Sequence, residues 1–185
     1  MSAPLTLALR ELGGEGPPLV VLHGLLGSSR NWQSAGVALA ERGYRVLAPD
    51  LRNHGSSPWG DDCGYAALAS DVVALLEKLA LGPVHLMGHS MGGQIGVMYA
   101  SRIRGRLGGL ILVASGSPYH RGFPGIRAPG LYLGSSAMSV TANIAGFWPG
   151  DRVNVGGFGR QSKVLITDWA RFARTGRMEP IGADI

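Results

Sequence analysis

The sequence has little of what marks secreted or membrane proteins. It holds one cysteine, Cys63, in 185 residues, which excludes an internal disulfide and fits a reducing compartment. No run approaches the roughly 18 to 20 uninterrupted apolar residues of a membrane span. The first 16 residues lack the basic start and apolar stretch of a secretory signal. We therefore expect a cytoplasmic protein without a membrane span, in which Cys63 is a spare thiol.

Acidic residues are scarce in the second half of the chain. Residues 1–100 carry 6 Lys and Arg against 8 Asp and Glu, a net charge of −2, whereas residues 101–185 carry 11 against 4, a net charge of +7. A basic surface can attract nucleic acid. These arginines are scattered, however, and no aromatic residues alternate with them in a base-stacking pattern. We expect a solvated basic face and no binding of nucleic acid.

A glycine-flanked serine is the most informative motif. Gly88-His89-Ser90-Met91-Gly92 follows the apolar run Val84–Met87 and precedes a stretch compatible with a helix. Glycines two before and two after a serine leave room for a strand that turns at once into a helix. Such a turn presents the serine as a nucleophile, and the Met91 N–H, in the first helical turn, would face a developing oxyanion. Ser90 is thus the candidate nucleophile.

A second loop agrees with this interpretation. The apolar run Leu19–Leu22 ends in His23-Gly24-Leu25-Leu26-Gly27. A loop of this kind supplies the other oxyanion N–H in enzymes with a nucleophile elbow. We assign that N–H to Leu25, with His23, Gly24, Gly88, His89 and Gly92 in supporting positions.

Short apolar runs alternate with helical patterns along the first 115 residues. This alternation predicts a mostly parallel, doubly wound sheet whose loops at the carboxyl ends of the strands form the site. The expected strands are residues 6–11 at an edge, 19–22, 45–48, 84–87 and 110–113. The expected helices are residues 31–42, 65–79 and 92–102.

Three segments together resemble the α/β-hydrolase superfamily: the H-G-L-L-G loop, Asp50-Leu51-Arg52-Asn53-His54-Gly55 and the G-H-S-M-G-G elbow. The middle segment is similar to that of the small esterases and thioesterase-like members. The resemblance implies an α/β-hydrolase fold and a serine hydrolase. Its substrate would be a small acyl ester or thioester, and it would use no cofactor or metal.

The alternating pattern fails after Ser115. Residues 116–163 carry repeated glycine and proline and few apolar runs, and a helix is expected at 164–174. We divide the chain into a hydrolase core, residues 1–115, and a lid-like, irregular segment, residues 116–185. In the superfamily a lid inserts here. Some apolar side chains of this segment would either line an acyl pocket or pack as its own small core: Leu131, Tyr132, Phe147, Trp148 and Phe158.

The base and the acid of a catalytic triad are not evident. In this superfamily both follow the serine, carried by loops of later strands, but no histidine follows His120 and the chain ends at Ile185. We therefore expect a sheet that is incomplete at its C-terminal side, in a chain truncated at that end. His120 is the candidate base, with His54 also expected near the rim. Asp50 is expected to brace its own turn through Arg52, and Asp71 to lie in mid-helix.

Two functions remain open at this point. The first is a serine hydrolase of carboxylic ester or thioester bonds. The second is a truncated or non-catalytic homologue that binds an acyl ligand or a partner without efficient turnover. An incomplete sheet would also leave a strand edge unpaired. We expect the segment after Ser115 to fold over that edge, or two chains to associate through it.

Overall fold

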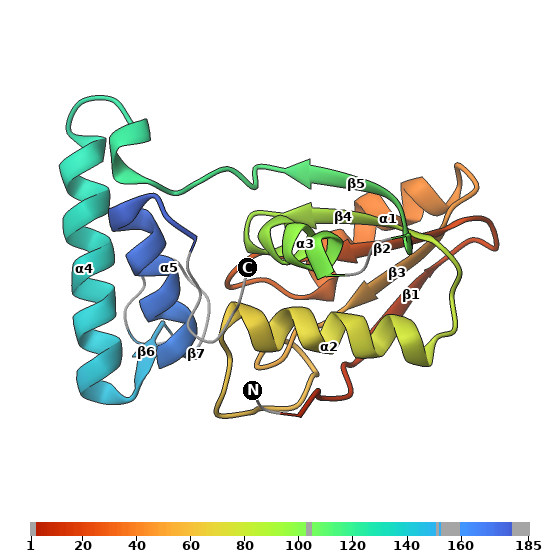
Figure 1. Cartoon of the computed structure of the whole chain (residues 1–185), viewed down its shortest axis with the longest axis horizontal. Coiled ribbons are helices and arrows are strands. Elements are labelled where there is room, and N and C mark those ends of the chain that lie inside the picture. Colours follow the sequence, from red (N-terminus) through yellow and green to blue (C-terminus); the bar gives the residue numbers. More distant parts are fainter. Residues whose placement is uncertain (1–2, 103–104, 151, 153–159, 179–185) are drawn as a thin grey trace. The chain divides into compact units, whose positions relative to one another are not determined.

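The computed structural model describes residues 3–102, 105–150, 152 and 160–178 (Figure 1). These residues form two compact units. The first holds the described residues up to Gly60 together with Ala67–Ser115. The second holds Asp61–Ala66 and the described residues from Gly116 onward.

The first unit is built on a five-stranded sheet in the order β1-β3-β2-β4-β5. β1 pairs antiparallel with β3, and the other neighbours are parallel. The strands are β1 (Leu9–Gly13), β2 (Pro18–Leu22), β3 (Arg45–Pro49), β4 (Val84–His89) and β5 (Leu107–Val113). β2 and β3 are almost wholly buried, as expected of parallel strands covered on both faces. The mostly parallel sheet predicted from the sequence is therefore confirmed.

Helices fill the connections between the strands. A short 3₁₀ helix, η1 (Ser29–Trp32), leads into α1 (Gln33–Ala40), and α2 (Tyr65–Lys78) and α3 (Met91–Arg102) follow. α1 packs on β1 and β3, whereas α3 packs on β4, β5 and β2. α2, which confirms the helix expected at residues 65–79, buries one side, with Leu68 and Val72 fully inaccessible to solvent. These elements hold the ends of β2, β3 and β4 in fixed register.

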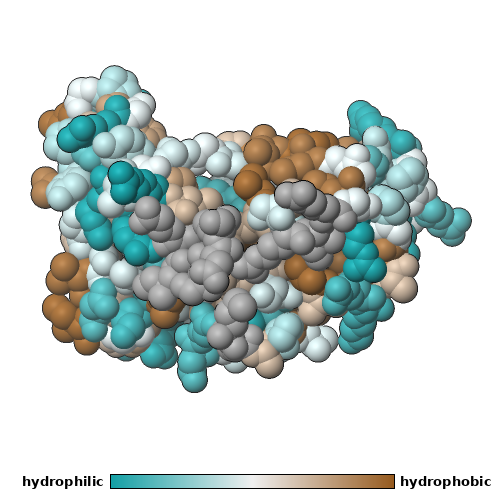
Figure 2. Space-filling model, in the orientation of Figure 1, coloured by the Kyte–Doolittle hydropathy of each residue, from teal (hydrophilic) through white to brown (hydrophobic). Residues whose placement is uncertain are grey.

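β5 lies at an edge of the sheet. Within the described part of the chain it pairs with β4 alone, and the folding of the segment after Ser115 over this edge stays a prediction. Ile111, Leu112 and Val113 are 40 to 49% exposed. Figure 2 shows hydrophobic surface in this region. Association of two chains through this edge stays a prediction.

The second unit contains a long helix that the sequence analysis missed. α4 (Arg127–Ala145) packs against α5 (Lys163–Thr175), which confirms the predicted second helix (Figure 1). The expectation of an irregular segment over residues 116–163 is therefore wrong. Pro129 is tolerated because it lies in the first turn, where a helical N–H has no acceptor. The unit also contains η2 (His120–Gly122) and a hairpin of β6 (Phe147–Pro149) and β7 (Arg160–Ser162).

The apolar residues of the second unit divide between packing and exposure. Trp148 is buried, and Phe147 carries the Arg160 guanidinium 3.6 Å from its ring centroid. Tyr132 is 43% exposed, and Phe158 lies outside the described residues. In the described residues no helix has the length and hydropathy needed to cross a membrane. The cytoplasmic location stays a prediction.

Candidate active site

Ser90 lies at the turn between β4 and α3. Its φ of 52° is in the left-handed region, which is uncommon for a residue with a side chain and marks a constrained turn. The Ser90 N–H donates to Val113 O (2.9 Å), and its carbonyl accepts the N–H groups of Gly93 (3.1 Å) and Gln94 (3.3 Å). The first bond fixes the turn to the end of β5, and the other two begin the helix.

Glycine is required on both sides of this turn because backbone segments approach closely. A Cβ on Gly88 would overlap the backbone of Gly92 and Gly93. A Cβ on Gly92 would lie 2.6 Å from His23 O and closer still to Leu22 O. Real Cβ atoms essentially never come within 3.0 Å of such atoms. The two glycines thus allow β4, α3 and the end of β2 to meet at Ser90.

The loop after β2 lies directly against the serine. A Cβ on Gly24 would be 3.1 Å from both Ser90 Cβ and His89 Nδ1. A turn closes this loop through Gly27 N–H to Gly24 O (3.0 Å), with Leu26 at φ 72°. Leu25 is the other central residue of that turn, and Met91 opens α3, where an N–H has no acceptor within the helix. The contribution of Leu25 and Met91 to an oxyanion hole stays a prediction that this packing favours.

The buried His23 side chain joins the loops after β2 and β3 through hydrogen bonds. Its Nε2 accepts the Leu51 N–H (3.0 Å), so its proton is on Nδ1, which donates to Gly24 O (2.9 Å). Burial, and the nearby His54, lower the pKa of His23 to about 4. A neutral ring with both nitrogens engaged cannot also serve as the base for Ser90. The supporting role predicted for His23 agrees with these bonds.

The lowered pKa of His23 predicts acid sensitivity. In the unfolded chain His23 is protonated below its ordinary pKa of 6.5, whereas in the folded chain it is protonated only below about pH 4. The free energy of unfolding therefore decreases as the pH is lowered through this window. The loss should reach roughly 3 kcal/mol at pH 4. Urea unfolding at pH 7, 6, 5 and 4 measures it. The slope should be shallower in His23→Gln than in wild type; equal slopes in the two proteins would contradict the assignment.

Asp50 holds backbone amides rather than Arg52, which corrects the sequence-based expectation. Its carboxylate accepts the N–H groups of Ser29 (2.6 Å) and Ser56 (2.8 Å). Burial alone would raise its pKa, but these hydrogen bonds outweigh burial, and the pKa of Asp50 lies below its ordinary value. Arg52 instead forms a fully buried ion pair with Asp71. Asp71 does lie in mid-helix, in α2.

His54 is buried rather than at the rim, a second correction. Its side chain is 4% exposed, its Nδ1 lies 2.8 Å from Arg52 O, and its ring centroid is 5.0 Å from that of His23. Sequence reasoning missed that His23, Asp50 and His54 tie together the loops after β2 and β3. The only available signal was that all three follow the carboxyl ends of neighbouring strands.

His85 and His89 are not placed to act as a base for Ser90. His85 is the second residue of β4, about 16 Å along the strand from Ser90. His89 precedes the serine and faces solvent. Among the described histidines of the first unit, none has a ring nitrogen hydrogen-bonded to the Ser90 hydroxyl.

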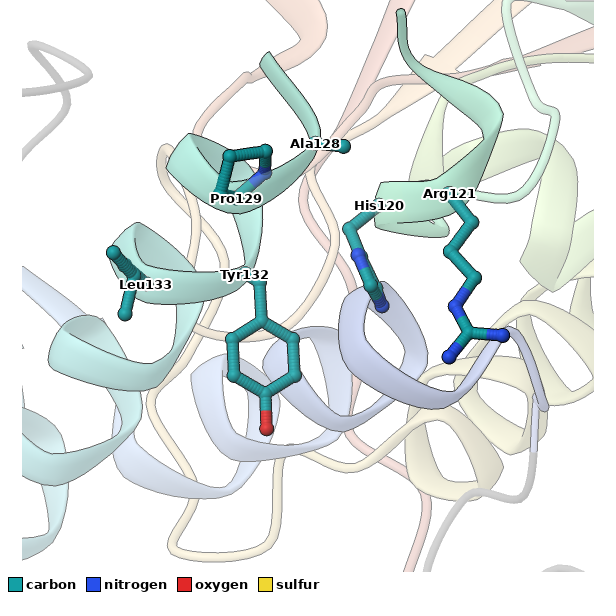
Figure 3. A pocket seen from close by; sticks show the side chains of 6 residues that line it. All are labelled: His120, Arg121, Ala128, Pro129, Tyr132 and Leu133. Carbon is teal, nitrogen blue, oxygen red and sulfur yellow. The ribbon is translucent and has the colours of Figure 1, made fainter. Parts of the chain in front are cut away.

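His120 belongs to the second unit, where it stacks edge-on against Tyr119 and Tyr132 at 5.0 and 5.1 Å. It lines an open, mostly apolar pocket of about 480 Å³ (Figure 3). The other lining residues are Arg121, Ala128, Pro129, Tyr132 and Leu133. Its role as a base stays a prediction. In the described residues no cluster of His, Cys, Asp and Glu could hold a metal ion.

The family model of the alpha/beta hydrolase fold matches residues 17–134. This span includes the Ser90 turn, the loop at Gly24 and the segment at Asp50. The chain belongs to the alpha/beta hydrolase family.

Relatives of the chain include several hydrolases. It is 45% identical over 100 residues to the mouse sn-1-specific diacylglycerol lipase ABHD11, covering 52% of this chain and 33% of that protein. It is 41% identical over 101 residues to a putative carbamate hydrolase, RutD, of Variovorax paradoxus, covering 54% of this chain and 38% of that protein. A thermophilic esterase from Thermogutta terrifontis superposes with a TM-score of 0.61 at 27% identity, over 80% of this chain and 51% of the esterase. The chain therefore spans about a third of the length of these curated relatives.

Proposed function

We propose that this chain carries the nucleophile and oxyanion-binding part of a serine hydrolase acting on carboxylic esters or thioesters. The observation that carries the proposal is the packing of the Gly24 loop against Ser90 at a left-handed turn. That packing supports a site in which the Ser90 hydroxyl, an amide of this loop and the N-terminus of α3 act together. The diacylglycerol lipase and the esterase among its relatives support an acyl ester as substrate.

The reaction follows from these groups. Ser90 Oγ attacks the acyl carbonyl carbon and loses its proton to a base. The carbonyl oxygen becomes an oxyanion, and the N–H groups of Leu25 and Met91 stabilise it. Collapse of the tetrahedral intermediate breaks the bond to the alcohol or thiol, which takes up a proton as it leaves. Water then attacks the acyl-enzyme and regenerates Ser90 with release of the acid.

A specific observation also favours the second candidate, a homologue that binds acyl compounds without efficient turnover. The described histidines of the first unit include none bonded to Ser90, and both ring nitrogens of His23 are engaged elsewhere. Without a base, an oxyanion hole and binding alone give on the order of 10³ to 10⁴ over water in proteases stripped of their triad. Turnover of a simple ester should then be weak.

Hydrolysis of p-nitrophenyl acetate and labelling by a fluorophosphonate probe test the proposal. We expect wild type to be labelled and to hydrolyse the ester, and Ser90→Ala to lose both. Ser101→Ala is the matched control, because this hydroxyl bonds only locally, to Met98 O at the end of α3. A decrease in His120→Ala would assign the base.

Two results would decide against Ser90 as the nucleophile. Equal rates in wild type and Ser90→Ala would exclude Ser90 as the nucleophile. If those equal rates accompanied retained binding of hexanoate, measured by calorimetry, the non-catalytic candidate would stand. Labelling of Ser90→Ala equal to that of wild type would place the reactive group elsewhere.

A further inference from the structure

Helix α4 buries small residues and exposes large apolar ones. It packs against α5 (Figure 1), and its buried residues are small: Ser135, Ser139 and Ala142. On the opposite side Leu133 is 66% exposed and Ile144 is 83% exposed. A surface helix ordinarily buries its large apolar residues and exposes small or polar ones. The outward side of α4 therefore has the composition of a surface that another molecule covers.

The outward apolar residues follow a regular spacing of 4, 3, 4, 3 and 4. All of them are exposed, and we call them the α4 stripe: Ile126, Gly130, Leu133, Ala137, Val140 and Ile144. This spacing has the 3.5-residue period of a seam between two helices in a coiled coil. The stripe is about 27 Å long at 1.5 Å per residue. Figure 2 shows hydrophobic patches along the outer edge of α4.

The sizes of the side chains in the α4 stripe complement one another in an antiparallel pair. Two antiparallel copies of α4 can be related by a two-fold axis that passes between the helices at the level of residue 135. Each stripe residue then meets a stripe residue of the second copy. The layers are then Ile126 with Ile144, Gly130 with Val140, and Leu133 with Ala137. In two of these three layers a large residue meets a small one, which lets the helices approach closely and evenly. A parallel pair would place Gly130 on Gly130 and Leu133 on Leu133, leaving voids beside crowded layers.

Charge favours the same orientation. Arg127 is the first residue of α4, and the helix ends at Ala145. In an antiparallel pair each Arg127 lies beside the C-terminal carbonyl groups of the other helix, where the helix dipole attracts a cation. A parallel pair would bring the two arginines together. No aspartate or glutamate occurs from Lys78 to Gly150, so α4 itself offers no carboxylate for Arg127.

We propose that the α4 stripe is a self-association surface that binds α4 of a second copy of this chain, antiparallel and two-fold symmetric. A lipid surface fits the stripe less well. Helices that lie on membranes carry basic residues along their polar face, whereas α4 itself contains one basic residue, Arg127, at its first position. Because the seam covers fewer than three heptads, the dimer is expected to form in the micromolar range.

Sedimentation velocity of the full chain from about 1 to 300 μM tests the surface. We expect a reversible shift from monomer to dimer in wild type. Val140→Asp should weaken association at least tenfold, because pairing would bury an unpaired charge. Val97→Asp, which places the same charge at a 46% exposed valine of α3, should associate like wild type. Circular dichroism checks that each variant is folded.

The register is tested by exchanging the two residues of the central layer. Leu133→Ala leaves a void, and Ala137→Leu opposes two leucines, so each should weaken association about tenfold. The double variant with both changes again opposes one leucine to one alanine and should return to within about threefold of wild type. A surface that is merely hydrophobic would not distinguish these combinations in this way.

Three outcomes would overturn the proposal. The first is a wild type that is monomeric throughout this range. The second is a dimer that Val140→Asp leaves intact, which would direct attention to the β5 edge. The third is a monomer that sediments with phosphatidylglycerol vesicles and loses that binding in Val140→Asp, which would make the stripe a lipid-binding surface.

Discussion

Replacing Gly92 with alanine is expected to lower the free energy of unfolding by about 2 to 3 kcal/mol. Two effects oppose each other here. Gly92 lies in α3, and alanine is more favourable than glycine inside a helix by about 1 kcal/mol. The added Cβ, however, would lie 2.6 Å from His23 O and closer to Leu22 O. Both contacts are backbone atoms of the buried end of β2, which cannot move without breaking the sheet, so the steric cost prevails.

Urea unfolding of the purified variant measures this change. Gly82→Ala is the matched control in the same unit, because a Cβ there meets nothing within 4 Å and its φ is not in the left-handed region. It should match or slightly exceed wild type. A Gly92→Ala protein as stable as Gly82→Ala would show that β2 and α3 are not in the close contact described. Total stabilities of 5 to 15 kcal/mol leave little reserve for a loss of this size.

The sequence predicted the sheet and the serine turn because their signals are local. Buried parallel strands appear as short apolar runs, and the glycines at 88 and 92 directly report a close backbone approach. Boundaries differ by a few residues, as in β5, which begins at Leu107 rather than Leu110. Short-range patterns of this kind contain the information that the fold of the first unit requires.

Helix α4 was not predicted because its apolar residues face outward. Glycines at 130 and 134 and a proline at 129 lower helix propensity, and periodicity is normally interpreted as an inward stripe. The inward side consists of small residues whose partner, α5, lies further along the chain. The outward position of its large apolar residues, which kept the helix from being predicted, is also the basis for proposing that α4 self-associates.

The histidines show where sequence reasoning about a site stops. His23 and His54 look alike in a motif, each beside a glycine after a strand. Their roles depend on atoms distant in sequence, such as the Leu51 N–H on His23 Nε2 and the packing of the two rings. Asp50 was likewise assigned to a neighbour, Arg52, when its partners are the Ser29 and Ser56 amides. Such bonds between loops are set by the tertiary fold.

The buried ion pair gives the second large effect. Arg52 and Asp71 are at most 1% exposed, and Arg52 Nη2 lies 2.6 Å from Asp71 Oδ1. Asp71 also accepts the Leu5 N–H at 2.7 Å, which fixes the segment before β1. Asp71→Ala removes the counter-charge of a buried guanidinium and should cost about 3 to 5 kcal/mol in urea unfolding. Glu11→Ala, which breaks the exposed pair with Arg45, should cost at most about 1 kcal/mol.

A double replacement separates the cost of an unpaired charge from the value of the pair. Burial of two charges carries a desolvation penalty that their attraction largely offsets, so an apolar pair of similar volume can be nearly neutral. The variant with Arg52→Met and Asp71→Leu should therefore be more stable than Asp71→Ala alone, although it has lost more native groups. If the double variant were the less stable of the two, the pair itself, through its bonds to the loop after β3 and to Leu5, would be what stabilises this face of the sheet.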